Sequence, residues 1–214
     1  MKFLKVSFFP LFLLLINYNL NAGCNSNIGS KHVTDTVAKN YDRLLSKREK
    51  QASEKRTDSL GVLLDTVDFQ VKTNDLVNYK DGVIPWINLD EPDKSLLQLI
   101  QKDEVVIHDN KVTVIIDYPL TNEYRFTLAS NTGFTRASLV KEISQAYYKI
   151  YQEEEATASV KTIPINERTK TYNRNQTNGK YGVWGHDIAD LVLTYIIVYR
   201  SPNGEILLSL IVDS

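Results

Sequence analysis

The sequence predicts an α+β domain in which an antiparallel sheet of about five strands carries one main helix on one face. A long amphipathic helical pattern occupies residues 133–156, and two strongly apolar runs close the chain at 191–214. Shorter alternating runs lie between 60 and 130. Strands that are apolar on nearly every residue are usually central in a sheet and covered by a helix. We therefore expect the helix to pack across the sheet.

The first elements of the domain are short. Alternation within 60–71 favours a strand, because three apolar side chains would share one face, namely Val67, Phe69 and Val71. Residues 79–94 are loop-like, with a turn signal at Asp81-Gly82. We expect a short helix to begin near Pro92, with a buried face that comprises Leu96, Leu97 and Ile100.

The middle of the chain contains the clearest periodicity. Two β-branched runs on either side of Asp109-Asn110 predict a hairpin. Residues 124–130 alternate between apolar and polar and predict a strand with one wet face. Thr135 is expected to cap the main helix, whose apolar stripe comprises Leu139, Val140, Ile143, Ala146, Tyr147 and Ile150. A last hairpin is expected around residues 201–204.

The beginning of the chain has the pattern of an export signal. Lys2 and Lys5 precede an apolar core at residues 6–16, which is shorter than the roughly 20 residues that span a membrane. The small residues Ala22 and Gly23 follow, as they do before a signal-peptide cleavage site. We therefore expect the signal peptide to be removed.

The sequence LNAGC, which ends at the only cysteine, Cys24, resembles the lipobox of bacterial lipoproteins of the Bacteroidetes type. The resemblance covers residues 1–24 only, and Asn21 departs from it, since an apolar residue is preferred there. It implies cleavage of 1–23 by signal peptidase II and lipidation of Cys24. The mature protein would be anchored in the cell envelope, on the periplasmic side or the cell surface, without spanning the membrane. The alternative is an ordinary signal peptide. The folded part resembles no characterised family.

Residues 24–59 are expected to form a tether for the domain at 60–214. Residues 33–45 have the apolar spacing of a short amphipathic helix, and 46–58 are so polar that a solvated extension is expected. Loss of residues 1–23 removes two lysines and lowers the formal net charge from −1 to −3. This nearly balanced charge gives no indication of nucleic acid as a partner.

Residues 163–187 form a long stretch with little periodicity before the last hairpin. Loops of this length are often functional. Basic groups beside flat aromatic rings suit a carboxylate-bearing or sugar-like ligand, such as an envelope glycan, or a protein partner. The expected ligand-binding residues of the 165–187 loop are Arg168, Tyr172, Arg174, Tyr181 and Trp184. The alternative is that the rings close the end of the sheet while the charges face water.

His186, Asp187 and Asp190 are the candidate catalytic residues. If they lie on one helical turn, His186 and Asp190 share a face and could hold a metal or act as a base and its orienting group in a hydrolase. In the alternative, Asp187 caps the turn, His186 hydrogen-bonds a backbone group or an aspartate, and Asp190 ends the loop. No third ligand and no nucleophile motif can be assigned. The sequence therefore favours non-catalytic binding without metal or cofactor, with a hydrolase and a structural or assembly lipoprotein as alternatives.

Two further features of this region concern its conformation. The acidic run Glu153-Glu154-Glu155 ends the main helix, where the helix dipole disfavours negative charge. We expect it to face solvent, and the alternative is contact with a cation or a basic partner. Gly179, Gly182 and Gly185 recur at every third position. They suit positive φ angles or close backbone approach, and they lack the strand–turn–helix context of a phosphate loop.

Overall fold

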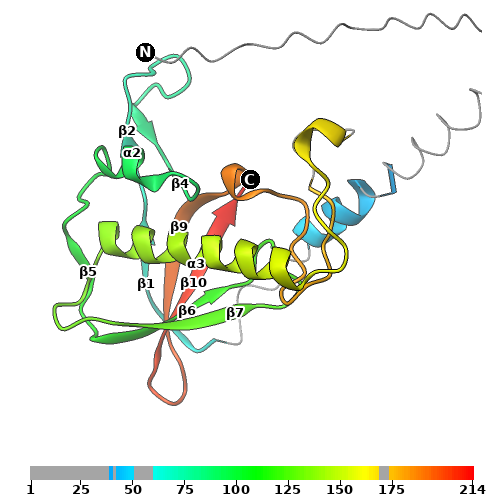
Figure 1. Ribbon diagram of the computed structural model, residues 1–214. Helices are drawn as coiled ribbons and strands as arrows, with labels where there is room; N and C mark the ends of the chain where they lie inside the picture. Colours follow the sequence, from blue (N-terminus) through cyan, green and yellow to red (C-terminus); the bar gives the residue numbers. More distant parts are fainter. Residues whose placement is uncertain (1–38, 41, 51–59, 169–173) are drawn as a thin grey trace, which may run out of the picture. The chain divides into compact units, whose positions relative to one another are not determined.

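Figure 1 shows the computed structural model of the protein. The residues that it describes are 39–40, 42–50, 60–168 and 174–214. Ala38–Ser214 forms one compact unit. The expected export signal and Cys24 lie outside the described residues, and the predictions made for them stay predictions.

The main sheet has six strands. Five of them are neighbours in the order β1-β9-β10-β6-β7, and the short strand β4 pairs with the first residues of β9. Their bounds are Val62–Asp68 for β1, Ile87–Asn88 for β4, Lys111–Ile116 for β6, Tyr124–Ala129 for β7, Val192–Arg200 for β9 and Ile206–Asp213 for β10. Together with the main helix, this sheet confirms the α+β class.

One strand pair makes the sheet mixed rather than purely antiparallel. β6 and β10 run parallel, whereas β9 and β10 form the predicted terminal hairpin. The predicted hairpin around Asp109-Asn110 is wrong. β5 (Val105–Ile107) pairs instead with β8 (Phe134–Thr135), and β6 pairs with β7 and β10. The β-branched runs do form strands, but composition does not specify their partners.

The main helix α3 (Arg136–Thr157) crosses one face of the sheet (Figure 1). Thr135 caps it as predicted. Its hydroxyl accepts a hydrogen bond from the Ser138 N–H at 3.1 Å, and the Ser138 hydroxyl accepts one from the Thr135 N–H at 2.9 Å. The whole predicted stripe is buried: Leu139, Val140, Ile143, Ala146, Tyr147 and Ile150. This apolar face supplies much of the core.

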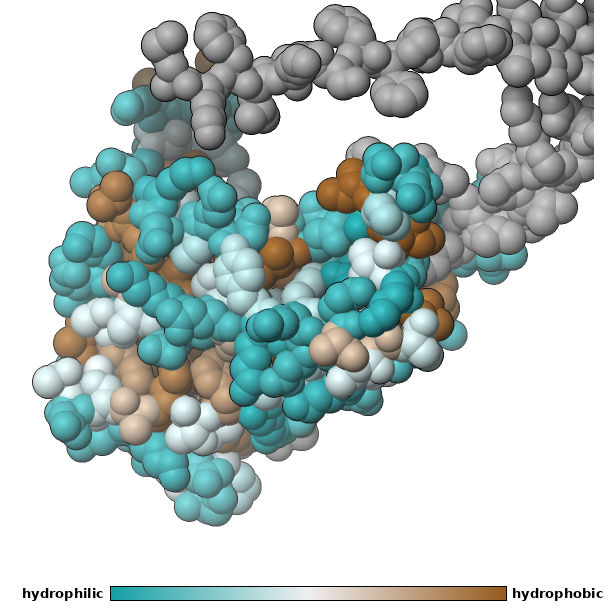
Figure 2. Space-filling view, viewed as in Figure 1, coloured by the Kyte–Doolittle hydropathy of each residue, from teal (hydrophilic) through white to brown (hydrophobic). Residues whose placement is uncertain are grey.

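Hydrogen bonds from the buried face of α3 fix the neighbouring loops. The Tyr147 hydroxyl donates to the Tyr118 carbonyl oxygen at 2.7 Å, and the Ser144 hydroxyl donates to that of Leu89 at 2.7 Å. On the visible surface of the domain, hydrophilic residues cover much of the area (Figure 2). Among the described residues, no helix is both long enough and apolar enough to cross a bilayer.

Smaller elements connect the strands. They are β2 (Val71–Lys72), β3 (Val83–Ile84), α2 (Pro92–Leu96) and the 3-10 turns η1 (Ile165–Glu167) and η2 (Ile188–Asp190). β3 lies within residues 79–94, which were expected to be loop, and it pairs with β2, which begins at the end of the 60–71 segment that was expected to be strand. The short helix begins at Pro92 as predicted, and Leu96 is buried. Leu97, which was expected on the buried face, is 77% exposed, because α2 ends one residue before it.

A helix precedes the sheet and belongs to the domain. Residues 42–50 are helical. The Leu45 side chain is buried in the main core, and the Glu49 carboxylate accepts a hydrogen bond from the Tyr118 hydroxyl at 2.9 Å. The expectation that the helix ends at residue 45 is therefore wrong, because it continues to residue 50, although Ser46, Lys47 and Lys50 are exposed. The single leucine and the polar contact together hold a segment that has little apolar surface of its own.

Candidate functional site

The turn at residues 177–182 is built around the buried carboxylate of Glu154. One carboxylate oxygen accepts from the Thr177 hydroxyl at 2.6 Å and the Gly179 N–H at 2.7 Å. The other accepts from the Tyr181 N–H at 2.7 Å and the Gly182 N–H at 3.1 Å. Glu154 is fully buried, so the expectation that this helix end is solvated is wrong for the middle glutamate.

The charge on Glu154 is stabilised locally. Burial raises its pKa, but the hydrogen bonds from the Thr177 hydroxyl and three backbone N–H groups outweigh burial and hold the pKa below its usual value. These donors also offset the unfavourable position at the C-terminal end of α3. Glu154 therefore links the main helix to the turn as a structural anchor.

The recurring glycines fit this structural role. At Gly179 a Cβ atom would lie 2.8 Å from the carboxyl carbon of Glu154 and 2.7 Å from the Thr157 hydroxyl. Gly182 and Gly185 have φ angles of 64° and 74°, which are readily adopted by glycine. The glycine pattern thus arises from close approach to a carboxylate and from backbone conformation.

The two predicted basic ligand contacts, Arg168 and Arg174, are occupied internally. The guanidinium of Arg168 donates two hydrogen bonds to the carboxylate of Asp187, one of them at 3.2 Å. Arg174 lies 4.8 Å from the centre of the Tyr151 ring and 3.8 Å from the same carboxylate. Both arginine side chains are almost fully buried. Their charges are thus paired inside the domain instead of facing a ligand.

The candidate catalytic residues do not converge on one reacting position. Asp187 and Asp190 form a capping box at η2, in which the Asp190 carboxylate accepts from the Asp187 N–H at 2.9 Å. The interpretation that Asp187 caps this turn is confirmed. In the described part of the chain, no group of three or more His, Cys, Asp or Glu side chains is placed to hold a metal ion.

The imidazole of His186 makes both of its described polar contacts through one ring nitrogen. Its Nε2 lies 3.0 Å from the Glu49 carboxylate and 3.3 Å from the Ser214 hydroxyl. A hydrolytic triad needs the acid and the nucleophile on opposite ring nitrogens. A relay from Glu49 through His186 to Ser214 therefore does not fit this geometry. The contacts instead join the 42–50 helix to the domain.

The rings of Tyr181 and Trp184 lie in the interior. Each side chain is only 3% exposed, and both belong to the main core. Trp184 packs edge-on against Tyr118, with ring centres 5.3 Å apart. The expectation that these rings face outward is wrong. The alternative is right that the rings pack inside the domain, but it is wrong that the charges face water, because the Arg168 and Arg174 side chains are buried. Tyr172 lies outside the described residues.

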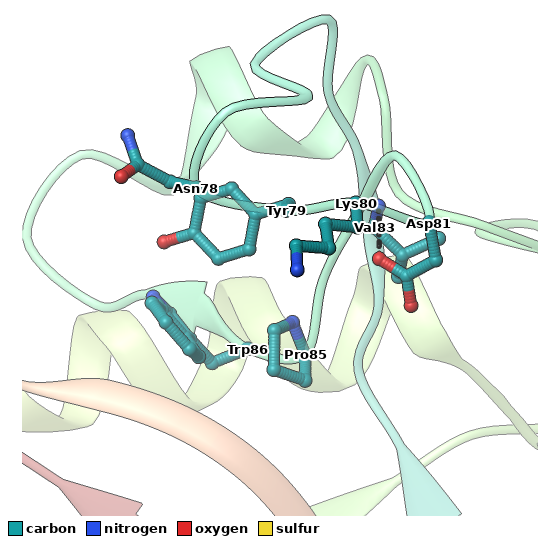
Figure 3. A pocket seen from close by; sticks show the side chains of 7 residues that line it. All are labelled: Asn78, Tyr79, Lys80, Asp81, Val83, Pro85 and Trp86. Atoms are coloured by element: carbon teal, nitrogen blue, oxygen red, sulfur yellow. Dashed lines mark hydrogen bonds between the residues drawn. The ribbon is translucent and has the colours of Figure 1, made fainter.

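An open cavity of about 500 Å³ lies elsewhere, in the loop around β3 (Figure 3). Its lining residues are Asn78, Tyr79, Lys80, Asp81, Val83, Pro85 and Trp86. The rings of Tyr79 and Trp86 meet edge to face, with centres 5.7 Å apart and planes at 70°. Both rings are partly exposed. We call this cavity the aromatic pocket.

The loop that carries the aromatic pocket is held by its own hydrogen bonds. The Asp75 carboxylate accepts from the N–H groups of Val77 and Asn78 and from the Asn78 side-chain amide at 2.7 Å. These bonds, led by that from the Asn78 side chain, lower the pKa of Asp75. The Gly82 N–H donates to the Tyr79 carbonyl oxygen at 2.9 Å. The loop is therefore pre-shaped before any ligand arrives.

Sequence reasoning missed the aromatic pocket, because residues 79–94 were assigned only to a loop. The signal that could have found it is the pair Tyr79 and Trp86, two large rings in a polar, turn-rich segment without a helical or strand period. Such rings have no regular face through which to enter the core.

Comparison of the chain with models of known protein families, with curated proteins and with solved structures gives no match.

Proposed function

We propose that the protein is a lipid-anchored protein of the bacterial envelope whose folded domain binds a ligand without catalysing a reaction. The aromatic pocket is the binding site. The observation that carries this proposal is the contrast between that open pocket and the polar groups near His186, which are engaged with one another. Ligand sites are typically concave, with aromatic walls and a few polar groups.

The membrane anchor in this proposal is supported by the LNAGC sequence that ends at Cys24. Mass spectrometry of the mature protein tests it. The expected result is an N-terminal Cys24 with attached acyl chains, and a Cys24→Ser variant that lacks them and leaves the membrane fraction. An unmodified amino terminus contradicts the anchor.

The binding role is tested by capture of envelope material. Full-length protein in detergent is immobilised and exposed to envelope glycans and to envelope proteins, beside a Trp86→Ala variant. We expect a retained ligand that this variant loses, while Tyr148→Ala, a change at an exposed ring on α3, retains it. If every retained ligand binds Trp86→Ala normally, the aromatic pocket is not the site.

A structural or assembly role is the second candidate, because β1 is an edge strand of the main sheet. Val62, Leu63 and Leu64 on it are 68%, 59% and 45% exposed. An exposed apolar edge favours pairing with another strand. Sedimentation of the full-length protein tests this role: a dimer that Leu63→Lys converts to a monomer supports it, and a wild-type monomer contradicts it.

A further inference from the structure

We infer that the aromatic pocket binds an acidic saccharide, with the sugar ring against the aromatic side chains and its carboxylate on the Lys80 ammonium group. This inference rests on the proposed binding function and names the class of ligand. Three features of the pocket carry it: the arrangement of the two rings, the position of the ammonium group, and the engagement of the neighbouring carboxylate.

The rings provide the apolar side of the site. Tyr79 and Trp86 lie at 70° to each other and form a corner, and Pro85 is exposed beside them. One face of a sugar ring presents only C–H groups, which carry partial positive charge. The face of an aromatic ring is negative. A sugar can therefore stack on a partly exposed ring while its hydroxyls stay in water. A wholly apolar ligand would gain nothing from the polar lining residues Asn78, Lys80 and Asp81.

Lys80 provides the charge. Its side chain extends toward the space between the rings of Tyr79 and Pro85 (Figure 3). Within the described part of the chain, the ammonium group of Lys80 has no hydrogen-bond or ion-pair partner. If a sugar stacks on the aromatic ring, a carboxylate on that sugar would accept charge-assisted hydrogen bonds from the Lys80 ammonium group. The pocket thus offers a cation next to a flat apolar surface.

The nearby acid Asp81 keeps its charge, but no ion pair joins it to Lys80 among the described residues. Asp81 also lines the pocket, but its carboxylate accepts from the Val83 N–H at 3.2 Å (Figure 3). It therefore supports the turn that leads into β3. In Figure 3 it lies to the side of the pocket, away from Trp86, so that Lys80 is the charged group beside the rings.

Binding of defined oligomers by the full-length protein in detergent tests the inference. The probes are oligogalacturonate and hyaluronan oligomers, which are acidic saccharides, a cello-oligosaccharide of matched length, which is neutral, and polyglutamate, which is a polyanion without sugar rings. Isothermal titration is performed with wild-type protein, Trp86→Ala and Lys80→Gln. Lys141→Gln, which changes an exposed lysine on α3, is the matched control.

The expected result is that at least one acidic oligomer binds more tightly than both comparison probes. Trp86→Ala should weaken that binding about 10-fold or more. Lys80→Gln should weaken it about 3- to 10-fold at low salt and less at high salt, while leaving binding of the neutral oligomer unchanged. Lys141→Gln should bind as wild type. Because Lys80 is exposed, its substitution tests the site even if Trp86→Ala folds poorly.

The inference is overturned by any of three results. These are equal binding of polyglutamate, a neutral oligomer that binds as tightly as the acidic ones, or no binding of either acidic oligomer. The broader proposal fails differently, namely when every ligand captured from the envelope is indifferent to Trp86→Ala. A captured ligand that depends on Trp86 but is not an acidic saccharide would leave the pocket as a binding site and reject the ligand class.

Discussion

The segment at residues 177–187, which includes the turn around Glu154, and the aromatic pocket contain similar residue types. The aromatic side chains are buried in the first and partly exposed in the second. In the turn, the rings of Tyr181 and Trp184 are buried and Asp187 is paired with Arg168. In the pocket, Tyr79 and Trp86 are partly exposed around an open cavity. Aromatic and charged side chains in an irregular segment therefore predict a binding surface only when nothing inside the protein satisfies them.

The largest expected difference between the two regions is in the contribution of their tryptophans to stability. Trp184→Ala should lower the free energy of unfolding by about 3–5 kcal/mol, because it removes a ring from the core and leaves a cavity. Trp86→Ala should lower it by only about 1–2 kcal/mol, since that ring is partly exposed. Urea denaturation followed by circular dichroism measures both. Equal losses of unfolding free energy in the two variants would show that Trp86 is packed as tightly as Trp184.

The anchor of the turn can be weakened without changing its shape. Glu154→Gln replaces one acceptor oxygen by an amide group that faces N–H donors, so we expect a loss of about 2–3 kcal/mol. Glu155→Gln, one residue away and half-exposed, is the control and should change stability by less than about 0.5 kcal/mol. The same urea titrations measure both, and a Glu154→Gln protein as stable as the control would contradict the buried anchor.

The same carboxylate should make stability depend on pH. The pKa of Glu154 in the folded protein is lower than its ordinary value of 4.5, so its contribution is present above that value and is lost as pH falls through the folded pKa. The difference in unfolding free energy between wild type and Glu154→Gln should therefore be constant above about pH 5 and should narrow toward pH 3. Denaturation over this pH range checks it. If the difference in unfolding free energy between wild type and Glu154→Gln did not change with pH, the charge of Glu154 would not be what stabilises the turn.

Part of the fold could be predicted from the sequence and part could not. The 3.6-residue period of α3 and the hydroxyl of Thr135 are local signals, so the main helix and its cap were predicted correctly. The apolar runs likewise predicted the β9–β10 hairpin. The parallel pairing of β6 with β10 joins segments far apart in the chain, and no local pattern encodes it.

The site was less predictable than the fold. The acidic run at the end of α3 looked solvated because its partners, such as the Gly179 and Tyr181 N–H groups, follow more than twenty residues later. Side-chain exposure in an irregular loop has no period to reveal it. For that reason the sequence wrongly predicts Trp184 at a surface and predicts only a loop around Trp86.

The smallest expected effect concerns the helix at 42–50. Glu49→Gln removes the charge that faces His186 and the Tyr118 hydroxyl. Because the Glu49 side chain is 41% exposed, the loss should stay below about 1 kcal/mol. Amide hydrogen exchange of residues 42–50 should nevertheless become faster, since the Glu49 carboxylate joins this helix to the domain beside the buried Leu45 side chain and the contact of Arg48 with the Trp184 ring. Unchanged exchange would show that the carboxylate does not fasten it.

Fluorescence quenching of the two tryptophans tests the central contrast most directly, because the chain contains only Trp86 and Trp184. The full-length protein is prepared as Trp184→Phe, which leaves the pocket ring as emitter, and as Trp86→Phe, which leaves the core ring, and each is titrated with acrylamide. We expect strong quenching and red-shifted emission from Trp184→Phe, and weak quenching with blue-shifted emission from Trp86→Phe. The reverse order, or equal quenching in two folded variants, would contradict the exposed position of the pocket ring and the buried position of the core ring.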